Sequence, residues 1–152
     1  MVKELGLELT KLDLSIDEDG NWRHEGVEIT HPRLLALLFS ALQKMGAGHF
    51  VCADGLCVPV RVADCPYAVL SVRHQTDSVV LLLTDGSYET LQPQTLTLDG
   101  QNIPRCRVKD GRFTARFSRQ AWMQLAEAIT EAQDGGYELR IGDQRIQLPD
   151  VK

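Results

Sequence analysis

The sequence predicts an α+β fold in which one hairpin-helix-hairpin unit occurs twice. Two apolar-periodic segments, each preceded by a capping residue and ended by glycines, stand among many short alternating segments bounded by turn residues. The first helix is predicted after Thr30, with Pro32 in its first turn, and runs to about Met45. The second begins after Ser118 and ends before Gly135. A chain of 152 residues is long enough for one domain or for two small halves.

Short strands surround the first helix. Residues 12–16 alternate between apolar and polar side chains, and residues 22–29 return as a second strand after an acidic turn. Beyond the helix, residues 50–52 and 56–62 predict a hairpin. The helix is apolar almost all round, so we expect it to be covered on more than one side.

The C-terminal half is richer in strands. Strands are predicted at residues 68–73, 79–83, 88–91, 95–98, 103–109, 112–117, 137–141 and 145–148. The clearest hairpin is closed by Asp110-Gly111, a two-residue sequence that favours a type I′ turn. In the second helix, one apolar stripe contains Trp122, Leu125, Ala126 and Ile129.

The two halves repeat the same order of elements. The offset that places Thr30 on Ser118 also places Leu34 on Trp122 and Val58 on Ile146. This agreement predicts a duplication, with a first half of residues 1–67 and a second of residues 68–152.

Several short motifs, in a fixed order, resemble one known family. They are Asp19-Gly20-x-Trp22 with Gly26 and Ile29, Leu38-Phe39, Gly48-x-Phe50, Val62-x-Asp64-x-Pro66-Tyr67 and Ala115-Arg116-Phe117-Ser118-Arg119. Together they span residues 16–125 and resemble the bacterial domain-of-unknown-function family numbered 1285. The resemblance implies an α+β duplication whose C-terminal half is like a pleckstrin-homology barrel. It also implies a site for a nucleotide-like small molecule between the halves and a role in signalling. The chain departs from the family at Ala53-Asp54-Gly55-Leu56, where the family has Thr-Pro-x-Glu.

The joint between the halves is the first candidate site. Asp64 precedes Cys65-Pro66, so the backbone there is extended or turned. Its carboxylate can accept nearby backbone N–H groups, or pair with Arg61, Arg116 or Arg119. One interpretation is a structural turn with a surface ion pair. The other is that Arg61, Asp64 and Tyr67 line a ligand cleft between the halves.

The second candidate site is the basic hairpin, by which we mean residues 105–116. A turn at Asp110-Gly111 sets Arg105 opposite Arg116, Arg107 opposite Thr114, and Lys109 opposite Arg112. Strand alternation then gives one face five cations and no acid. Compensation is expected from a phosphate-bearing ligand, an acidic partner, or an acid on a neighbouring strand such as Glu89.

Composition narrows the function classes. A net charge of −5 disfavours nucleic-acid binding, and no apolar run is long enough to cross a membrane. Residues 1–5 have no secretory apolar core, so we expect a cytoplasmic protein. Cys52 and Cys57 could face each other across their hairpin and form a disulfide, but in that compartment we expect all four cysteines to stay reduced. No residue pattern predicts a cofactor or a metal site.

The sequence favours a non-enzymatic protein, because no acid–base or nucleophile constellation can be assembled from its motifs. It predicts a ligand-binding or signalling module that takes a nucleotide-like or other anionic small molecule between its halves. The alternative is a structural or protein-interaction protein, a homo-oligomer that buries Leu35 and Phe39 between subunits.

A nucleotide or polyphosphate is expected to raise the melting temperature, because the cations of the basic hairpin would bind it. The double substitution Arg105→Glu with Arg116→Glu is expected to abolish the rise in a thermal-shift assay. Equal stabilisation of the substituted protein would contradict an anion site on this hairpin.

Overall fold

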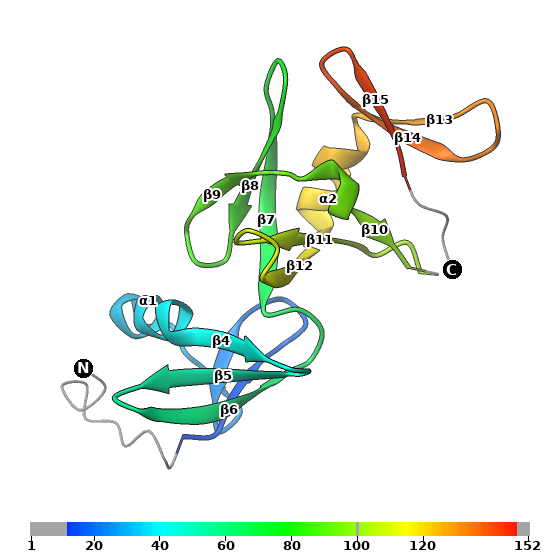
Figure 1. Ribbon diagram of the computed structural model, residues 1–152. Coiled ribbons are helices and arrows are strands. Elements are labelled where there is room, and N and C mark those ends of the chain that lie inside the picture. Colours follow the sequence, from blue (N-terminus) through cyan, green and yellow to red (C-terminus); the bar gives the residue numbers. More distant parts are fainter. Residues whose placement is uncertain (1–11, 100, 149–152) are drawn as a thin grey trace. The chain divides into compact units, whose positions relative to one another are not determined.

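The computed structural model describes residues 12–99 and 101–148, so residues 1–5, on which the expectation about secretion rests, lie outside them. The chain divides into an N-terminal unit, Met1–Pro66, and a C-terminal unit, Tyr67–Lys152. The described residues form a mixed α+β structure, mostly sheet, with two α-helices and three sheets (Figure 1). Neither helix is long and apolar enough to cross a lipid bilayer.

The N-terminal unit is built on one six-stranded sheet with the order β3-β2-β1-β6-β5-β4. Its strands are β1 (Leu14–Ile16), β2 (Trp22–His24), β3 (Val27–Glu28), β4 (Leu42–Met45), β5 (Gly48–Ala53) and β6 (Leu56–Val62). β1 and β6 are parallel, and this pairing joins the hairpin before the helix to the strands after it.

Helix α1 (Pro32–Ala41) packs on this sheet through one buried face. Phe39 meets Trp22 edge to face, with ring centroids 5.7 Å apart. Trp22 is only 1% exposed, and among the described residues its indole N–H has no hydrogen-bond partner. Leu35 is half-buried, and the predicted homo-oligomer stays a prediction.

Three sequence predictions for this unit are wrong in detail. The N-cap is His31, whose Nδ1 accepts the N–H of Leu34, and not Thr30. The helix ends at Ala41 and not near Met45, because Leu42–Met45 pairs with β5 and buries Leu42 opposite Val51. The strand predicted at residues 22–29 is two strands, since Glu25 and Gly26 both have positive φ and turn the chain between them.

The C-terminal unit contains a six-stranded sheet, β10-β11-β12-β7-β8-β9, and a three-stranded sheet, β13-β14-β15. Their bounds are β7 (Tyr67–His74), β8 (Val79–Leu83), β9 (Tyr88–Thr90), β10 (Thr97–Leu98), β11 (Pro104–Val108), β12 (Phe113–Phe117), β13 (Ile129–Glu131), β14 (Tyr137–Ile141) and β15 (Gln144–Gln147); a 3₁₀ helix, η3, spans Pro93–Thr95. In the described part of the chain β9 and β10 remain the edges of the larger sheet, so the expected pleckstrin-homology-like barrel is not closed.

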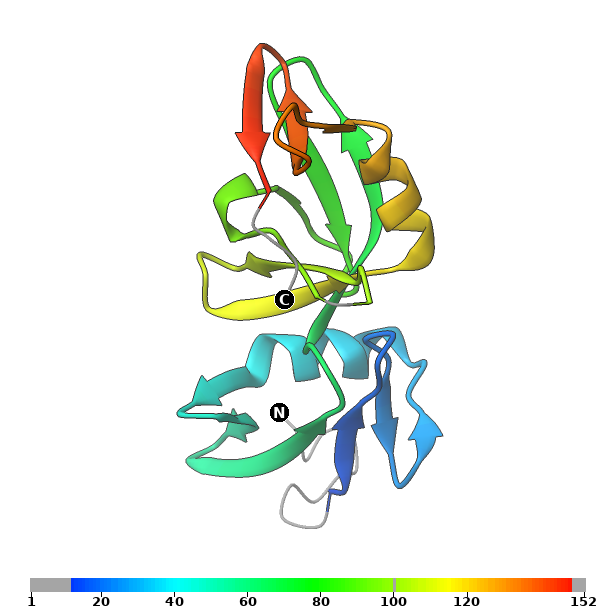
Figure 2. The same cartoon turned by 90° about the vertical axis from the view of Figure 1, so that its right-hand side faces the viewer.

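Helix α2 (Arg119–Ala126) has Ser118 as its N-cap, and the Oγ atom of Ser118 accepts the N–H of Ala121 at 3.1 Å. The helix lies along β7, to which it is also joined by the side chain of Gln124, whose Oε1 accepts the N–H of Val72 at 2.7 Å (Figure 2). The sequence predicts one stripe through Ile129, but the helix ends at Ala126 and Ile129 opens β13.

The expectation of reduced thiols is wrong for one pair of cysteines. Cys52 and Cys57 lie directly opposite each other on β5 and β6, with Cα atoms 4.1 Å apart, and form a disulfide. The two-residue turn at Asp54-Gly55 fixes the register that brings them together. Such bonds persist mainly in oxidising surroundings, so this one does not fit the reducing compartment that the sequence predicts.

Thiol titration of the denatured protein, purified without reductant, should find only the two thiols of Cys65 and Cys106. Reduction should release the other two and lower the free energy of unfolding by about 2 kcal/mol, because the bond closes a short loop. Urea unfolding of the Cys52→Ser, Cys57→Ser double variant measures the same loss without reductant. Four reactive thiols before reduction would contradict the disulfide.

Candidate ligand-binding site

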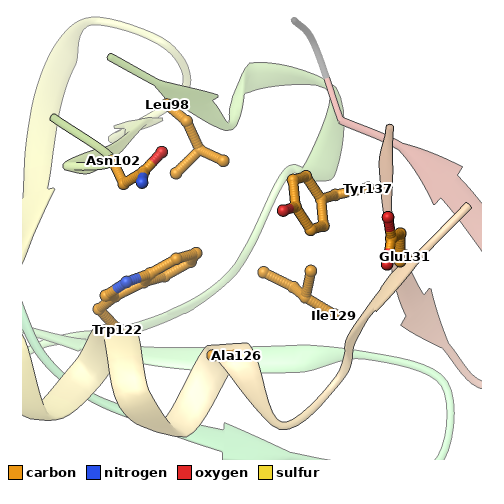
Figure 3. Close-up of a pocket in the computed structure, with 7 residues that line it drawn as sticks. All are labelled: Leu98, Asn102, Trp122, Ala126, Ile129, Glu131 and Tyr137. Carbon is orange, nitrogen blue, oxygen red and sulfur yellow. The ribbon is translucent and has the colours of Figure 1, made fainter. Parts of the chain in front are cut away.

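The C-terminal unit contains a pocket beside α2, at its junction with β13 and β14. Its volume is about 310 Å³, which is within the range of small-ligand sites. Its lining residues are Leu98, Asn102, Trp122, Ala126, Ile129, Glu131 and Tyr137 (Figure 3).

The helical wall of the pocket follows from the period of α2. Ala121 and Leu125 are fully buried and face the unit's core. Trp122 and Ala126 each lie one residue further along, about 100° around the helix, and therefore point to a neighbouring side. The apolar stripe that the sequence predicts as core is thus divided, and one part of it lines the pocket.

The sheet wall follows from alternation on the β13–β14 hairpin. Ile129 is opposite Leu139, which is fully buried, and Glu131 is opposite Tyr137. Residues two apart in a strand share a face, so these side chains all continue the inward face of the hairpin. Figure 3 shows Ile129 beside Tyr137 and across the open space from Trp122, with the Tyr137 hydroxyl pointing into that space and Glu131 beyond Tyr137.

The remaining wall comes from the turn around Asp99. The Oδ1 atom of Asp99 accepts the N–H groups of Gln101 and Ile103 at 2.8 and 2.9 Å. The bond from Ile103, with a further one from Arg105, lowers the pKa of Asp99 to about 2, so the carboxylate is ionised at neutral pH. Asn102 has a φ of 60°, a conformation that asparagine tolerates better than most residues. The turn places Leu98 and Asn102 across the pocket from Trp122 (Figure 3).

The polar atoms of the lining are available to a ligand. In residues 12–99 and 101–148, no protein group hydrogen-bonds the Asn102 amide, the Trp122 indole N–H or the Tyr137 hydroxyl. These groups lie among the apolar side chains of Leu98 and Ile129. An apolar wall with a few convergent donors and acceptors is the usual composition of a small-molecule site.

The basic hairpin has the predicted register. Arg105 is opposite Arg116 and Arg107 is opposite Thr114, with a turn between Val108 and Phe113. The cations have partners, however. Arg105 forms an ion pair with Asp99 at 2.9 Å, and Arg107 Nη1 donates to the carbonyl oxygen of Gly111 at 3.1 Å.

Lys109 is not on the basic face, contrary to the prediction. Its φ of 55° is left-handed, which interrupts the alternation of the strand. The side chain turns to Asp85 and Ser87, to which Nζ donates at 2.7 and 2.8 Å, and Nζ lies 5.5 Å from the centroid of the Tyr67 ring. The expected acid Glu89 instead accepts the backbone N–H of Lys109.

The other predicted site residues belong to two different units. Arg61 forms an ion pair with Asp13, and Asp64 accepts a hydrogen bond from the thiol of Cys65, both within the N-terminal unit. Tyr67 is a core residue of the C-terminal unit, 3% exposed, with Phe113 at a centroid distance of 5.5 Å. Its burial, and then the charge of Asp85, raise the pKa of the Tyr67 phenol, which therefore stays protonated.

Arg119 is the first residue of α2 and is exposed. Across the part of the chain that the structure describes, no group of three or more histidine, cysteine or acidic side chains is arranged to bind a metal ion.

The sequence does not single out Asn102, Glu131 or Tyr137 as site residues, although Tyr137 opens a predicted strand. Trp122, Ala126 and Ile129 were found, but as core. The one available signal was the large aromatic side chain of Trp122 on a stripe that otherwise holds smaller residues.

Solved structures with this fold exist. No family model matches the sequence, and no curated protein matches it. A DUF1285 family protein from Silicibacter pomeroyi DSS-3 is similar with a TM-score of 0.74 and 20% identity, over 90% of this chain and 79% of that one. The chain has the DUF1285 fold.

A second DUF1285 family protein, from Shewanella baltica OS155, has a TM-score of 0.65 and 15% identity, over 77% of this chain and 92% of that one. The resemblance inferred from the ordered sequence motifs is therefore confirmed at the level of the fold.

Lys109→Met should lower the free energy of unfolding by about 1–3 kcal/mol, because Asp85 is left largely buried without its charged donor. Arg107→Met is the matched control, since its side chain is exposed and bonds only a turn carbonyl; we expect a change within about 0.5 kcal/mol. Urea unfolding at neutral pH measures both. Equal losses would contradict a stabilising role for the Lys109–Asp85 pair.

The same pair makes stability depend on pH. Burial alone would raise the pKa of Asp85, but hydrogen bonds from Lys109 and Ser87 outweigh it and lower the pKa. Because the pKa of Asp85 is lower in the folded than in the unfolded protein, its ionisation stabilises the fold at pH values above the unfolded-state pKa of about 4. This stabilisation is lost as the pH falls through the folded-state pKa. Asp85→Asn should reduce the slope of stability against pH below about 4. An unchanged slope would show that Asp85 has an ordinary pKa.

Proposed function

We propose that the protein is a non-enzymatic ligand-binding module and that the pocket beside Trp122 binds a small molecule. The observation that carries the proposal is the pocket itself: about 310 Å³, with apolar walls and four polar side chains that no described protein group engages. A preformed apolar cavity with a few convergent polar groups is the default location for a ligand.

The composition of the lining supports binding rather than chemistry. Glu131 and Tyr137 are its ionisable residues, and the lining contains no serine, cysteine or lysine that could act as a nucleophile beside them. Nucleophilic catalysis needs a nucleophile within hydrogen-bond reach of a base.

The predicted anionic ligand stays a proposal of its own, tested by the thermal-shift assay with a nucleotide or polyphosphate described above. The ion pairs of Arg105 and Lys109 with acids of their own unit weaken its support, because local carboxylates already compensate these cations. We also propose a role in signalling, in which the bound ligand would be the signal.

A duplication is supported by the order of elements in the two units. Each contains an antiparallel hairpin, a capped helix and three antiparallel strands in succession: β1-β2, α1 and β4–β6, then β11-β12, α2 and β13–β15. The pairing differs, because β1 joins β6 in one sheet whereas β13–β15 form a sheet of their own. In this interpretation the pocket exists because β13–β15 form a separate sheet. Strands β13 and β14 of this sheet supply one wall of the pocket.

Filling the pocket tests the proposal. A fragment library screened by protein-observed NMR should shift the signals of the Trp122 indole N–H and of Leu98 and Tyr137 together. Ala126→Phe should abolish these shifts, because the added ring occupies the pocket. Met123→Phe is the matched control, since it adds an aromatic ring to the same helix at an exposed position outside the pocket.

Fragment shifts that survive Ala126→Phe would place binding elsewhere. The absence of any fragment that shifts these signals in the unsubstituted protein would overturn the pocket as a binding site.

A further inference from the structure

We propose that the pocket selects a small organic cation, an ammonium group on an apolar body, and rejects anions of the same size. The inference rests on the proposed function, because it assumes that the pocket beside Trp122 is a ligand site. It reverses the sign of charge that the sequence predicts for the ligand.

The charged residue of the pocket lining favours a cation over an anion. Among the lining residues Glu131 is the one with a formal charge at neutral pH, and no lysine, arginine or histidine is present. In the described part of the chain no ion pair or hydrogen bond engages the Glu131 carboxylate. An anion in the pocket would therefore meet a carboxylate without a compensating cation.

The position of Glu131 on its strand is the second argument. Glu131 lies opposite Tyr137 in the β13–β14 ladder, on the same face as the buried Leu139, and is an exposed residue of the pocket lining. The nearby Glu138 is one residue from Tyr137, on the opposite face, and Arg145 lies 3.9 Å from it. The hairpin thus has a paired acid on one face and, on the face that lines the pocket, an acid without such a pairing.

Aromatic rings are the third argument. Trp122 and Tyr137 contribute two of the walls, and the phenol and indole rings have electron-rich faces that attract cations. Figure 3 shows the indole extending along the helical side of the pocket, with the Tyr137 ring and Ile129 together on the sheet side. An ammonium group between the two rings would have Glu131 beyond one of them, while Leu98 and Ile129 cover its apolar body.

The cations of the basic hairpin do not offset Glu131. Arg105, the cation closest in sequence to the lining residue Asn102, is paired with Asp99, and Lys109 is paired with Asp85. Their charges are compensated within a few ångströms, and the remaining field is screened by salt over about 8–10 Å.

Matched probes test the charge preference. Benzyltrimethylammonium, benzyl alcohol and benzenesulfonate have similar rings and differ in charge, and their binding can be measured by NMR titration of the Trp122 indole N–H. We expect the cation to bind about tenfold more tightly than the neutral probe, as cation–π attraction and one carboxylate would give, and the sulfonate to bind least.

The variants separate the two contributions. Glu131→Gln should remove most of the preference for the cation over the neutral probe while leaving the neutral probe's affinity unchanged. Trp122→Leu should weaken both. Glu127→Gln, which removes a carboxylate at the exposed end of α2 outside the lining, is the control and should change neither.

Equal affinity for cation and neutral probe, tighter binding of the sulfonate, or an equal loss of preference in Glu127→Gln would overturn the inference. In those cases the proposed function still stands if fragments occupy the pocket and Ala126→Phe excludes them. Failure of that fragment test would overturn both.

Fluorescence quenching gives a second test that needs no ligand. Trp22→Phe leaves Trp122 as the single tryptophan, and it also removes a buried N–H without a described partner. We expect caesium ions to quench Trp122 more than iodide does, relative to free indole, and Glu131→Gln to narrow the difference. Stronger quenching by iodide would mean that the local potential is positive and would overturn the inference.

Discussion

The attachment of α2 to β7 is the interaction on which the C-terminal unit depends. Ala121 and Leu125 bury one side of the helix completely, and Gln124 holds the neighbouring side by accepting the N–H of Val72. The register of β7 with β8 shifts near this point, between Val69 and Ser71. These contacts fix the rotation of α2 about its own axis. Trp122 therefore points toward the second, three-stranded sheet.

That second sheet exists because the helix stops early. A helix continued through Ile129 would have completed an ordinary apolar stripe against the core. Instead the chain leaves the helix after Ala126, and Ile129 becomes the first residue of β13. Alternation along β13 and β14 then sets Glu131 and Tyr137 beside the helix, and the pocket is the space between two elements of different period.

Charge in this unit is balanced at short range. The basic hairpin has like charges opposite each other, which opposes strand pairing, yet acids from neighbouring turns and strands compensate them. Lys109 shows the cost of such an arrangement most clearly, because it leaves the strand conformation altogether to reach Asp85 and the ring of Tyr67. The pocket is different, since Glu131 lines it without a described counter-charge.

The sequence by itself determined the α+β class, the existence of both helices, the Ser118 cap of α2, the Asp54-Gly55 hairpin and the register of Arg105 with Arg116. These depend on caps, turn residues and alternation within a few residues. It could not determine where α1 ends, because Leu42 and Met45 continue the apolar period of the helix and only the pairing with β5 makes this segment a strand. The sequence allowed the disulfide but could not decide it, because the register of β5 with β6 does so. Nor could it find the pocket, whose walls are a turn, a helix and a hairpin that the fold brings together. Only the tertiary structure decided which side of each element faces which neighbour, and that choice separates Trp122 of the pocket from Leu125 of the core.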